Sequence, residues 1–356
     1  MLKTKQLLER AVVKRSWQKG LVPSRSAVTL TAISACVVGV PLIVYSYKCL
    51  MMVLFQSKLI YMPYLPLGAR DPESWKETFK ESQLHIKGWK FRPYLLKYES
   101  DLNSFSWLKH KVFRGVNLRG FLLENSSSVG SPEVNVIYFQ GNAGNMYHRK
   151  DLFEGLLKQG DVLGIKLRVI AIHLRGYGDS SGSSSQKILE EDSKHILEEI
   201  RREYAGARTA IYGHSLGGAV AINLACVAAK HLDGLVLENT FTSIHDMVSS
   251  MYPAWLPYRY LARVFLKSPW DSLGSINRLQ APIHCPILLL ASQKDDVVPH
   301  TMMQELYKAL TLNQRSSIYG SPYWKSLSYG YHDYAYQQPG FWKAWQDFLK
   351  KIITPY

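Results

Sequence analysis

A serine between two glycines is the residue with the clearest chemical potential in the sequence. Ser215 lies at the centre of GHSLG (213–217), after the apolar run 209–212 and before the small-residue, helix-like stretch 219–225. Strand, tight turn and helix is the context that a Gly-x-Ser-x-Gly nucleophile elbow requires. Side chains at the two glycine positions would collide with the neighbouring helix or strand. We therefore predict that Ser215 attacks a carbonyl carbon.

A candidate acid and a candidate base follow Ser215 in the order that such a serine needs. The apolar run 286–291 predicts a buried strand, and the loop after it holds Asp295 and its rival Asp296. We prefer Asp295 because it begins the D-x-x-V-P pattern. His332 follows beside a glycine in GYHD. The order Ser, Asp, His is that of the α/β-hydrolases and differs from the chymotrypsin and subtilisin orders.

The three side chains have distinct expected roles. His332 takes the proton of Ser215 and later returns it to the leaving group, while Asp295 holds the imidazole tautomer and stabilises the cation. His195 and His300 have no motif around them and are interpreted as ordinary surface or core residues.

The chemistry also needs backbone N–H groups aimed at the developing oxyanion. The apolar run 134–139 predicts a strand that ends in the glycine-rich loop QGNAGN (140–145). We expect the oxyanion hole to consist of the N–H groups of Asn142 and Leu216. A dinucleotide or phosphate loop is the alternative for 140–145, but the G-x-G-x-x-G spacing is absent.

Several sequence blocks together resemble one known family. The blocks are YFQGNAGN (138–145), LRGYGDSSG (174–182), GHSLGGA (213–219) and LENTFTSI (237–244), with the acid and histidine loops after them. In this order they resemble the bud-emergence family of membrane-anchored α/β-hydrolases over roughly residues 84–352. The resemblance implies a serine hydrolase with Ser215, Asp295 and His332 as its triad, behind a single N-terminal membrane anchor.

Three positions depart from the usual pattern of that family. Gln140 replaces a histidine, His173 replaces an acid, and His214 stands where arginine is frequent. None of them belongs to the predicted triad. We expect these departures to alter the packing around the oxyanion loop and the substrate preference.

The N-terminal part of the chain has the pattern of a membrane anchor. Residues 1–25 hold seven basic side chains and one acid, and the next 22 residues, 26–47, hold no charge. This apolar length is sufficient to cross a bilayer as a helix. We assign 1–25 to a basic flank, 26–55 to a transmembrane anchor and 56–83 to a linker. The positive-inside rule then places the catalytic domain on the side opposite the flank.

The cellular membrane in which the protein resides is predicted less directly. Asn125 begins a glycosylation sequon in a polar loop, which fits the lumen of the secretory system, and we expect an endoplasmic reticulum membrane protein. The alternative is a mitochondrial membrane, because the N-terminus is basic and acid-poor as transit peptides are.

Composition narrows the remaining function classes. A hydrophobic content of 47% is ample for a buried core, and the four cysteines have neither metal-site nor disulfide-framework spacing. The net charge of +15 is dispersed outside the basic flank, so we expect a bilayer as partner and no nucleic acid. The proposed chemistry needs no metal or organic cofactor.

Strand and helix patterns alternate along residues 84–356. Residues 84–124 predict antiparallel strands, the runs 169–172 and 234–238 predict parallel strands, and 188–203 predicts an amphipathic helix. This alternation predicts an α/β-hydrolase fold, a doubly wound and mostly parallel sheet, preceded by one transmembrane helix. The aromatic, proline-containing stretch 251–270 interrupts the rhythm and predicts a small cap insertion at about 241–280.

The sequence therefore predicts a membrane-anchored serine hydrolase for a lipophilic ester or thioester. Two alternatives stay open. One is a catalytically idle hydrolase-fold scaffold in membrane organisation, suggested by Gln140 and His173. The other is a serine peptidase with the same triad. The sequence does not name the acyl donor or any protein partner.

Overall fold

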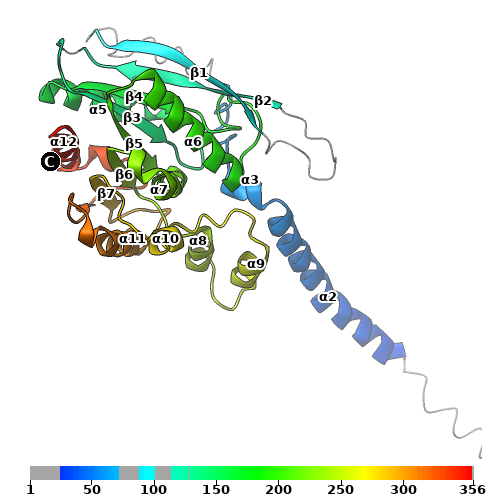
Figure 1. Cartoon of the computed structure of the whole chain (residues 1–356). Coiled ribbons are helices and arrows are strands. Elements are labelled where there is room, and N and C mark those ends of the chain that lie inside the picture. The colour runs from blue at the N-terminus through cyan, green and yellow to red at the C-terminus, as the bar shows by residue number, and fades with distance from the viewer. Residues whose placement is uncertain (1–24, 72–87, 101–113, 127, 355–356) are drawn as a thin grey trace, which may run out of the picture. The chain divides into compact units, whose positions relative to one another are not determined.

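A computed structural model describes residues 25–71, 88–100, 114–126 and 128–354 of the chain (Figure 1). Residues 1–24 of the basic flank and 72–83 of the predicted linker lie outside the described residues. The chain divides into two compact units, residues 1–54 and residues 55–356.

The first unit contains one long helix, α2, from Arg25 to Leu54, with Pro41 inside it. Its stretch Ala32–Leu54 is long and apolar enough to cross a membrane, and none of it is buried inside the protein. A fully exposed apolar helix of 23 residues is costly in water. The expected N-terminal apolar helix is therefore present.

The second unit is built on one eight-stranded sheet in the order β1-β2-β4-β3-β5-β6-β7-β8. Pairs β1–β2 and β2–β4 are antiparallel and the other neighbours are parallel. This is the predicted hairpin followed by a parallel sheet, and it confirms the fold class. The strands are β1 Lys90–Ser100, β2 Arg114–Glu124, β3 Glu133–Phe139, β4 Lys166–Ile172, β5 Arg208–His214, β6 Gly234–Glu238, β7 Ile287–Ser292 and β8 Tyr323–Leu327.

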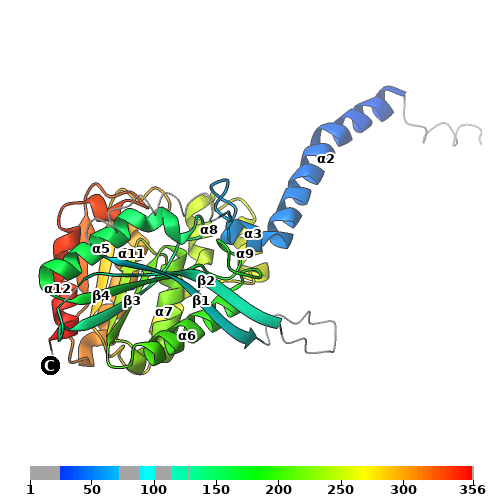
Figure 2. The same ribbon diagram turned by 90° about the horizontal axis from the view of Figure 1, so that it is seen from above.

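Helices cover both faces of this sheet (Figure 2). One buried cluster joins the sheet to α5 and α12, and another joins the opposite face to α6, α7, α10 and α11. Both faces of a central strand are thus buried, which is why the strands read as continuous apolar runs. These helices are α5 Lys150–Leu163, α6 Gln186–Glu203, α7 Leu216–Ala228, α10 Ser272–Asn277, α11 His300–Asn313 and α12 Phe341–Ile353.

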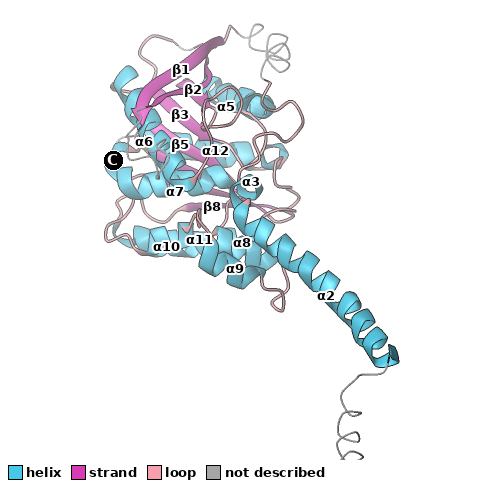
Figure 3. Cartoon of the chain, turned by 90° about the vertical axis from the view of Figure 1, so that its right-hand side faces the viewer, coloured by secondary structure: helices cyan, strands magenta, loops and turns pink. Residues whose placement is uncertain are grey.

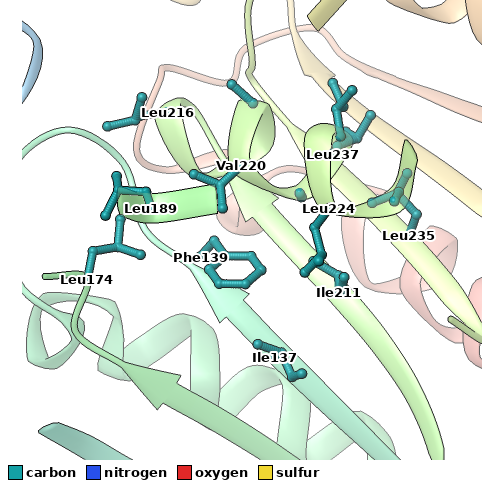
Figure 4. Close-up of a cluster of buried hydrophobic side chains, with 14 of the residues drawn as sticks. Ile137, Phe139, Leu174, Leu189, Ile211, Leu216, Val220, Leu224, Leu235 and Leu237 are labelled. Carbon is teal, nitrogen blue, oxygen red and sulfur yellow. The ribbon is translucent and has the colours of Figure 1, made fainter. Parts of the chain in front are cut away.

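Helix α7 carries the serine and is fixed by its packing on the sheet. Leu216, Val220 and Leu224 lie on one side of the helix and pack among Phe139 of β3 and Ile211 of β5 (Figure 4). These residues are spaced four apart, which places their side chains on one helical face. The start of α7 is therefore held at the carboxyl end of β5.

The insertion between β6 and β7 contains two short helices beside α10, α8 Ile244–Met251 and α9 Tyr258–Phe265 (Figure 3). The Ser243 side chain accepts a hydrogen bond from the backbone N–H of Asp246 and caps α8. These helices lie within the region where the sequence predicts a cap.

Residues 56–70, which we call the strap, follow α2 and pack on the domain. The strap begins with the short helix α3, Gln56–Ile60. The Trp270 indole N–H donates to the Tyr61 hydroxyl at 2.9 Å, and Met62 forms a parallel bridge with Ala143. The first part of the predicted linker is thus in contact with both the cap region and the 140–145 loop.

Candidate active site

Ser215 occupies a strained turn between β5 and α7, with φ of 54°. A positive φ is rare for a residue with a side chain and marks stored backbone strain. A Cβ at Gly217 would lie 2.0 Å from the Phe139 carbonyl oxygen, and one at Gly213 would lie 2.4 Å from the Gly217 carbonyl oxygen. The flanking glycines are therefore required by sterics, as the sequence pattern predicts.

Asp295 and His332 are brought together by the loops after β7 and β8. The imidazole Nδ1 of His332 lies 2.8 Å from Asp295 Oδ2 and 3.0 Å from Oδ1. The Asp295 side chain is buried and accepts the backbone N–H groups of Val297 and Val298, each at 2.8 Å. These bonds orient the carboxylate, which then selects the tautomer with hydrogen on Nδ1 and leaves Nε2 as the base.

The remaining sequence candidates lie outside this pair. Asp296 accepts the backbone N–H of His332 at 3.3 Å and so supports the loop. His300 Nδ1 contacts the Ser292 carbonyl. His195 lies on α6, with its ring against Tyr98.

The backbone carbonyl of His332 is held from two sides. It accepts hydrogen bonds from Nε2 of His214 at 3.0 Å and from the amide of Asn239 at 2.9 Å. Because a carbonyl only accepts, His214 Nε2 carries the hydrogen, and its Nδ1 faces the Arg149 guanidinium at 3.1 Å. Burial and the adjacent Arg149 charge hold the pKa of His214 well below its usual value, so the ring is neutral.

Arg149 ties the same loop from the other side. Its guanidinium pairs with the Asp333 carboxylate and donates to the Asp333 carbonyl at 2.9 Å. Asp333 directly follows His332. Arg149 lies in no recognised motif, so sequence reasoning did not identify it.

A buried acid lies behind the serine. Glu238 ends β6, its carbonyl accepts the Ser215 backbone N–H at 2.9 Å, and its carboxyl accepts the Tyr212 hydroxyl at 2.5 Å. Burial raises the pKa of Glu238 to about 7. A carboxyl inside an apolar strand was the available signal for this residue.

The 140–145 loop approaches the serine closely. A Cβ at Gly141 would lie 3.4 Å from the Ser215 Cβ. The Asn142 carbonyl accepts the Met62 backbone N–H at 2.8 Å and the Tyr177 hydroxyl at 2.9 Å. The loop that carries the predicted Asn142 donor is therefore fixed beside Ser215. Leu216, which carries the other predicted donor, directly follows Ser215 and begins α7.

The strap makes two further bonds to this loop. The Gly144 N–H donates to the Leu65 carbonyl at 2.6 Å, and the Asn145 amide donates to the Ala69 carbonyl at 2.9 Å. Residues that follow the apolar helix thus hold the loop that approaches Ser215.

Two of the family departures have structural roles. The Gln140 amide donates to the Gly144 carbonyl at 3.1 Å and closes the loop on itself. His173 is buried, with Nδ1 3.2 Å from an Asp179 oxygen, and burial lowers its pKa to about 4. Both therefore act in the folded structure rather than in the predicted proton transfer.

The sequon residue Asn125 is buried. Its amide nitrogen donates to Asp161 Oδ1 at 2.8 Å and to the Ile165 carbonyl at 2.9 Å, and its oxygen accepts the Leu167 N–H at 2.8 Å. A glycan on that nitrogen would disrupt this network. The folded domain therefore does not favour glycosylation at Asn125, because the sequence motif carries no information about burial.

Among the described residues, no group of three His, Cys, Asp or Glu side chains is arranged to hold a metal ion. The four cysteines are unpaired.

Comparisons with known proteins agree with this fold. A family model described as the alpha/beta hydrolase fold matches residues 134–268. Protein bem46 of Schizosaccharomyces pombe is 35% identical over 255 residues, which are 71% of this chain and 74% of that protein. The alpha/beta hydrolase domain-containing protein WAV2 of Arabidopsis thaliana is 29% identical over 85% of this chain and 89% of that protein.

Enzymes occur among the further relatives. Lysophosphatidylserine lipase ABHD12 of Macaca fascicularis is 30% identical over 63% of this chain and 58% of that protein. The solved esterase Pf2001 of Pyrococcus furiosus has a TM-score of 0.53 at 18% identity, covering 77% of this chain and 95% of that one. At that identity the likeness shows the fold alone.

Proposed function

Because the chain belongs to the bud-emergence family of α/β-hydrolases, we propose that it is a membrane-anchored serine hydrolase that cleaves a lipophilic ester or thioester. Two observations carry the proposal: Ser215 lies in a strained turn, and the buried Asp295–His332 pair has Nδ1 and Oδ2 2.8 Å apart. The pair is connected to that turn by His214, the residue before Ser215, which contacts the His332 carbonyl at 3.0 Å. A strained backbone and a buried carboxylate both cost folding stability, which is expected at a catalytic site.

In the proposed mechanism each of these groups has one role. Ser215 Oγ attacks the acyl carbon while His332 Nε2 takes its proton, and Asp295 stabilises the imidazolium. The N–H groups of Asn142 and Leu216 donate hydrogen bonds to the oxyanion and stabilise its charge. The intermediate collapses as His332 protonates the leaving alcohol or thiol. Water, deprotonated by the same imidazole, then cleaves the acyl-enzyme and regenerates Ser215.

The lipophilic part of the proposal has two supports. The 23-residue apolar stretch Ala32–Leu54 is long enough to hold the domain at a bilayer. In addition, the relatives include a protein named as a lysophosphatidylserine lipase. A hydrolase fixed at a membrane encounters lipid-borne esters at high local concentration.

The scaffold alternative rested on Gln140 and His173. The Gln140 side chain bonds within the oxyanion loop, at 3.1 Å from the Gly144 carbonyl, and His173 is buried away from solvent. Both substitutions are therefore compatible with an active site. No observation favours the peptidase alternative over an esterase.

The test is labelling of the full chain in membranes by a fluorophosphonate probe, with hydrolysis of p-nitrophenyl acyl esters of increasing chain length. Ser215→Ala should abolish labelling and lower ester turnover by at least about a thousandfold, since triad serines contribute that much or more. Ser128→Ala, an exposed serine outside the site, is the matched control and should behave as wild type.

Folded wild-type protein that neither reacts with the probe nor cleaves any ester would leave only the idle scaffold. Turnover of peptide amides in preference to esters would support the peptidase.

A further inference from the structure

The cap presents a cluster of large apolar side chains to solvent. On α8, α9 and the loop between them, Trp255 is 82% exposed, Tyr260 is 78% exposed and Val264 is 66% exposed. Met251 and Phe265 are also at least half exposed. Several exposed apolar side chains on two short helices and the loop between them favour an interaction site more than a lone exposed residue does. We call these five residues the cap face.

Hydrogen bonds connect the cap face to Gln56 at the start of the strap. The Gln56 amide donates to the Phe265 carbonyl at 3.0 Å, and the Lys267 N–H donates to Gln56 Oε1 at 2.7 Å. Gln56 is buried by this contact. The chain therefore fixes residues 265–267 to the first turn of the strap.

Chain geometry then limits how far residues 265–267, at the end of the cap face, can lie from a bilayer. Gln56 is two residues beyond Leu54, the last residue of α2, so their Cα atoms are at most about 8 Å apart. The polar interfacial layer of a bilayer is of similar thickness, roughly 5–8 Å on each side. If α2 spans the membrane, residues bonded to Gln56 lie at the headgroup level.

The composition of the cap face fits that level. Trp and Tyr are enriched where an apolar ring meets polar headgroups. Arg263 and Lys267 are exposed among them and can bind lipid phosphates, while their aliphatic stems stay in apolar surroundings.

We propose that the cap face inserts into the headgroup region of the same bilayer that α2 crosses. This inference rests on the anchor part of the proposed function and is independent of the catalytic part. The partner that we propose for the cap face is the phospholipid surface. The experiment must distinguish this partner from a second protein that covers the same face.

The experiment uses the full chain in vesicles of phosphatidylcholine and phosphatidylserine, with and without brominated acyl chains. An environment-sensitive fluorophore is attached through Val264→Cys and, in a second variant, Tyr260→Cys. Val227→Cys is the matched control for Val264→Cys, because Val227 is also a valine, is 65% exposed and lies in the last turn of α7, outside the cap. The unsubstituted chain measures the background from Cys36, Cys49, Cys226 and Cys285. A cooperative thermal unfolding transition like that of the wild type confirms that each variant is folded.

Brominated lipid should quench the fluorophore at 264 and 260, with loss of intensity, and leave the one at 227 unchanged. Val38→Cys in α2 reports on the anchor separately. Quenching at 38 without quenching at 264 or 260 overturns the docking and leaves the anchor intact. No quenching at 38 overturns the anchor and the docking with it. A label at 264 that is shielded from aqueous iodide yet not quenched by lipid means that protein covers the face, which also overturns the proposal.

Discussion

At the scale of residues, the position of His332, the proposed catalytic base, depends on hydrogen bonds to its backbone as well as on its carboxylate partner Asp295. The His332 carbonyl is held by His214 and Asn239, and the adjacent Asp333 is held by Arg149. His214 therefore has a second function besides filling a position in the nucleophile elbow. It joins the loop of the base to Arg149 through its two ring nitrogens.

This arrangement predicts different results for two substitutions of His214. Gln has a donor and an acceptor, so His214→Gln can keep the contacts to His332 and Arg149 and should retain most of kcat. His214→Leu removes both contacts and leaves the His332 carbonyl with one partner fewer. We expect kcat to fall by about tenfold to a hundredfold, as for the loss of one or two buried hydrogen bonds near a reacting group.

Steady-state ester hydrolysis measures the effect, and thermal unfolding as a function of pH separates it from stability. The pKa of His214 is depressed in the folded state. The contribution of the neutral ring to the free energy of unfolding of the wild type should therefore be fully present above pH 6.5 and decrease as the pH falls below that value. His214→Leu should lack this contribution of the ring. Equal kcat values for the Leu and Gln variants would refute the positioning role.

At the scale of elements, the sheet was largely predictable and the strap was not. Residues 234–238 were predicted as a strand and form β6, and 286–291 was predicted where β7 spans Ile287–Ser292. Central parallel strands are buried on both faces and give an apolar run that can be recognised in the sequence. The turn at Ser215 could be recognised because only glycine fits at the two flanking positions, 213 and 217.

The strap has no such local signal. Its structure is set by bonds to residues far along the chain, such as Met62 to Asn142 and Leu65 to Gly144. Arg149 and the burial of Asn125 were invisible for the same reason. A sequence pattern reports local geometry, whereas these residues are defined by tertiary contacts.

The strap and Tyr177 hold the oxyanion loop, which predicts an effect at a distance from the triad. The fully buried Tyr177 donates its hydroxyl to the Asn142 carbonyl at 2.9 Å. Tyr177→Phe removes that bond with little change in volume. It should destabilise the domain by about 1 kcal/mol and lower kcat several-fold with KM nearly unchanged, because a looser loop weakens stabilisation of the transition state.

Tyr94→Phe is the matched control, since that hydroxyl binds Glu203 at 2.7 Å on the outer strand β1. It should leave both kinetic constants at wild-type values. Acyl-ester kinetics decide the matter: a kcat for Tyr177→Phe equal to that of the control would mean that the loop does not depend on this bond.

At the scale of the whole molecule, the distribution of charge bears on orientation. The basic flank before α2 carries a net charge of +6, and no compensating cluster of acids follows it. Translocating this flank through the apolar core of a membrane is unfavourable. The flank is expected on the cytosolic or matrix side and the domain on the other side.

The burial of Asn125 changes how this orientation can be tested. Absence of a glycan shift is the expected result for a folded domain in the lumen, because the Asn125 nitrogen is engaged with Asp161 and Ile165. Glycosylation is thus not a useful reporter of topology here. Chemical accessibility of cysteines is a better one, since it works equally well in the secretory and mitochondrial cases.

The last prediction uses a pair of cysteine substitutions. Val129 is fully exposed on the domain, and Ser16 lies in the basic flank. In sealed microsomes with the cytosolic face outward, an impermeant maleimide should modify Ser16→Cys at once and Val129→Cys only after detergent is added. The bilayer is the barrier in both cases, so the two variants must respond in opposite ways. In mitochondria stripped of their outer membrane, the same orientation should expose Val129→Cys and protect Ser16→Cys. Modification of Val129→Cys in intact microsomes, with Ser16→Cys protected, would reverse the topology and place the hydrolase domain in the cytosol.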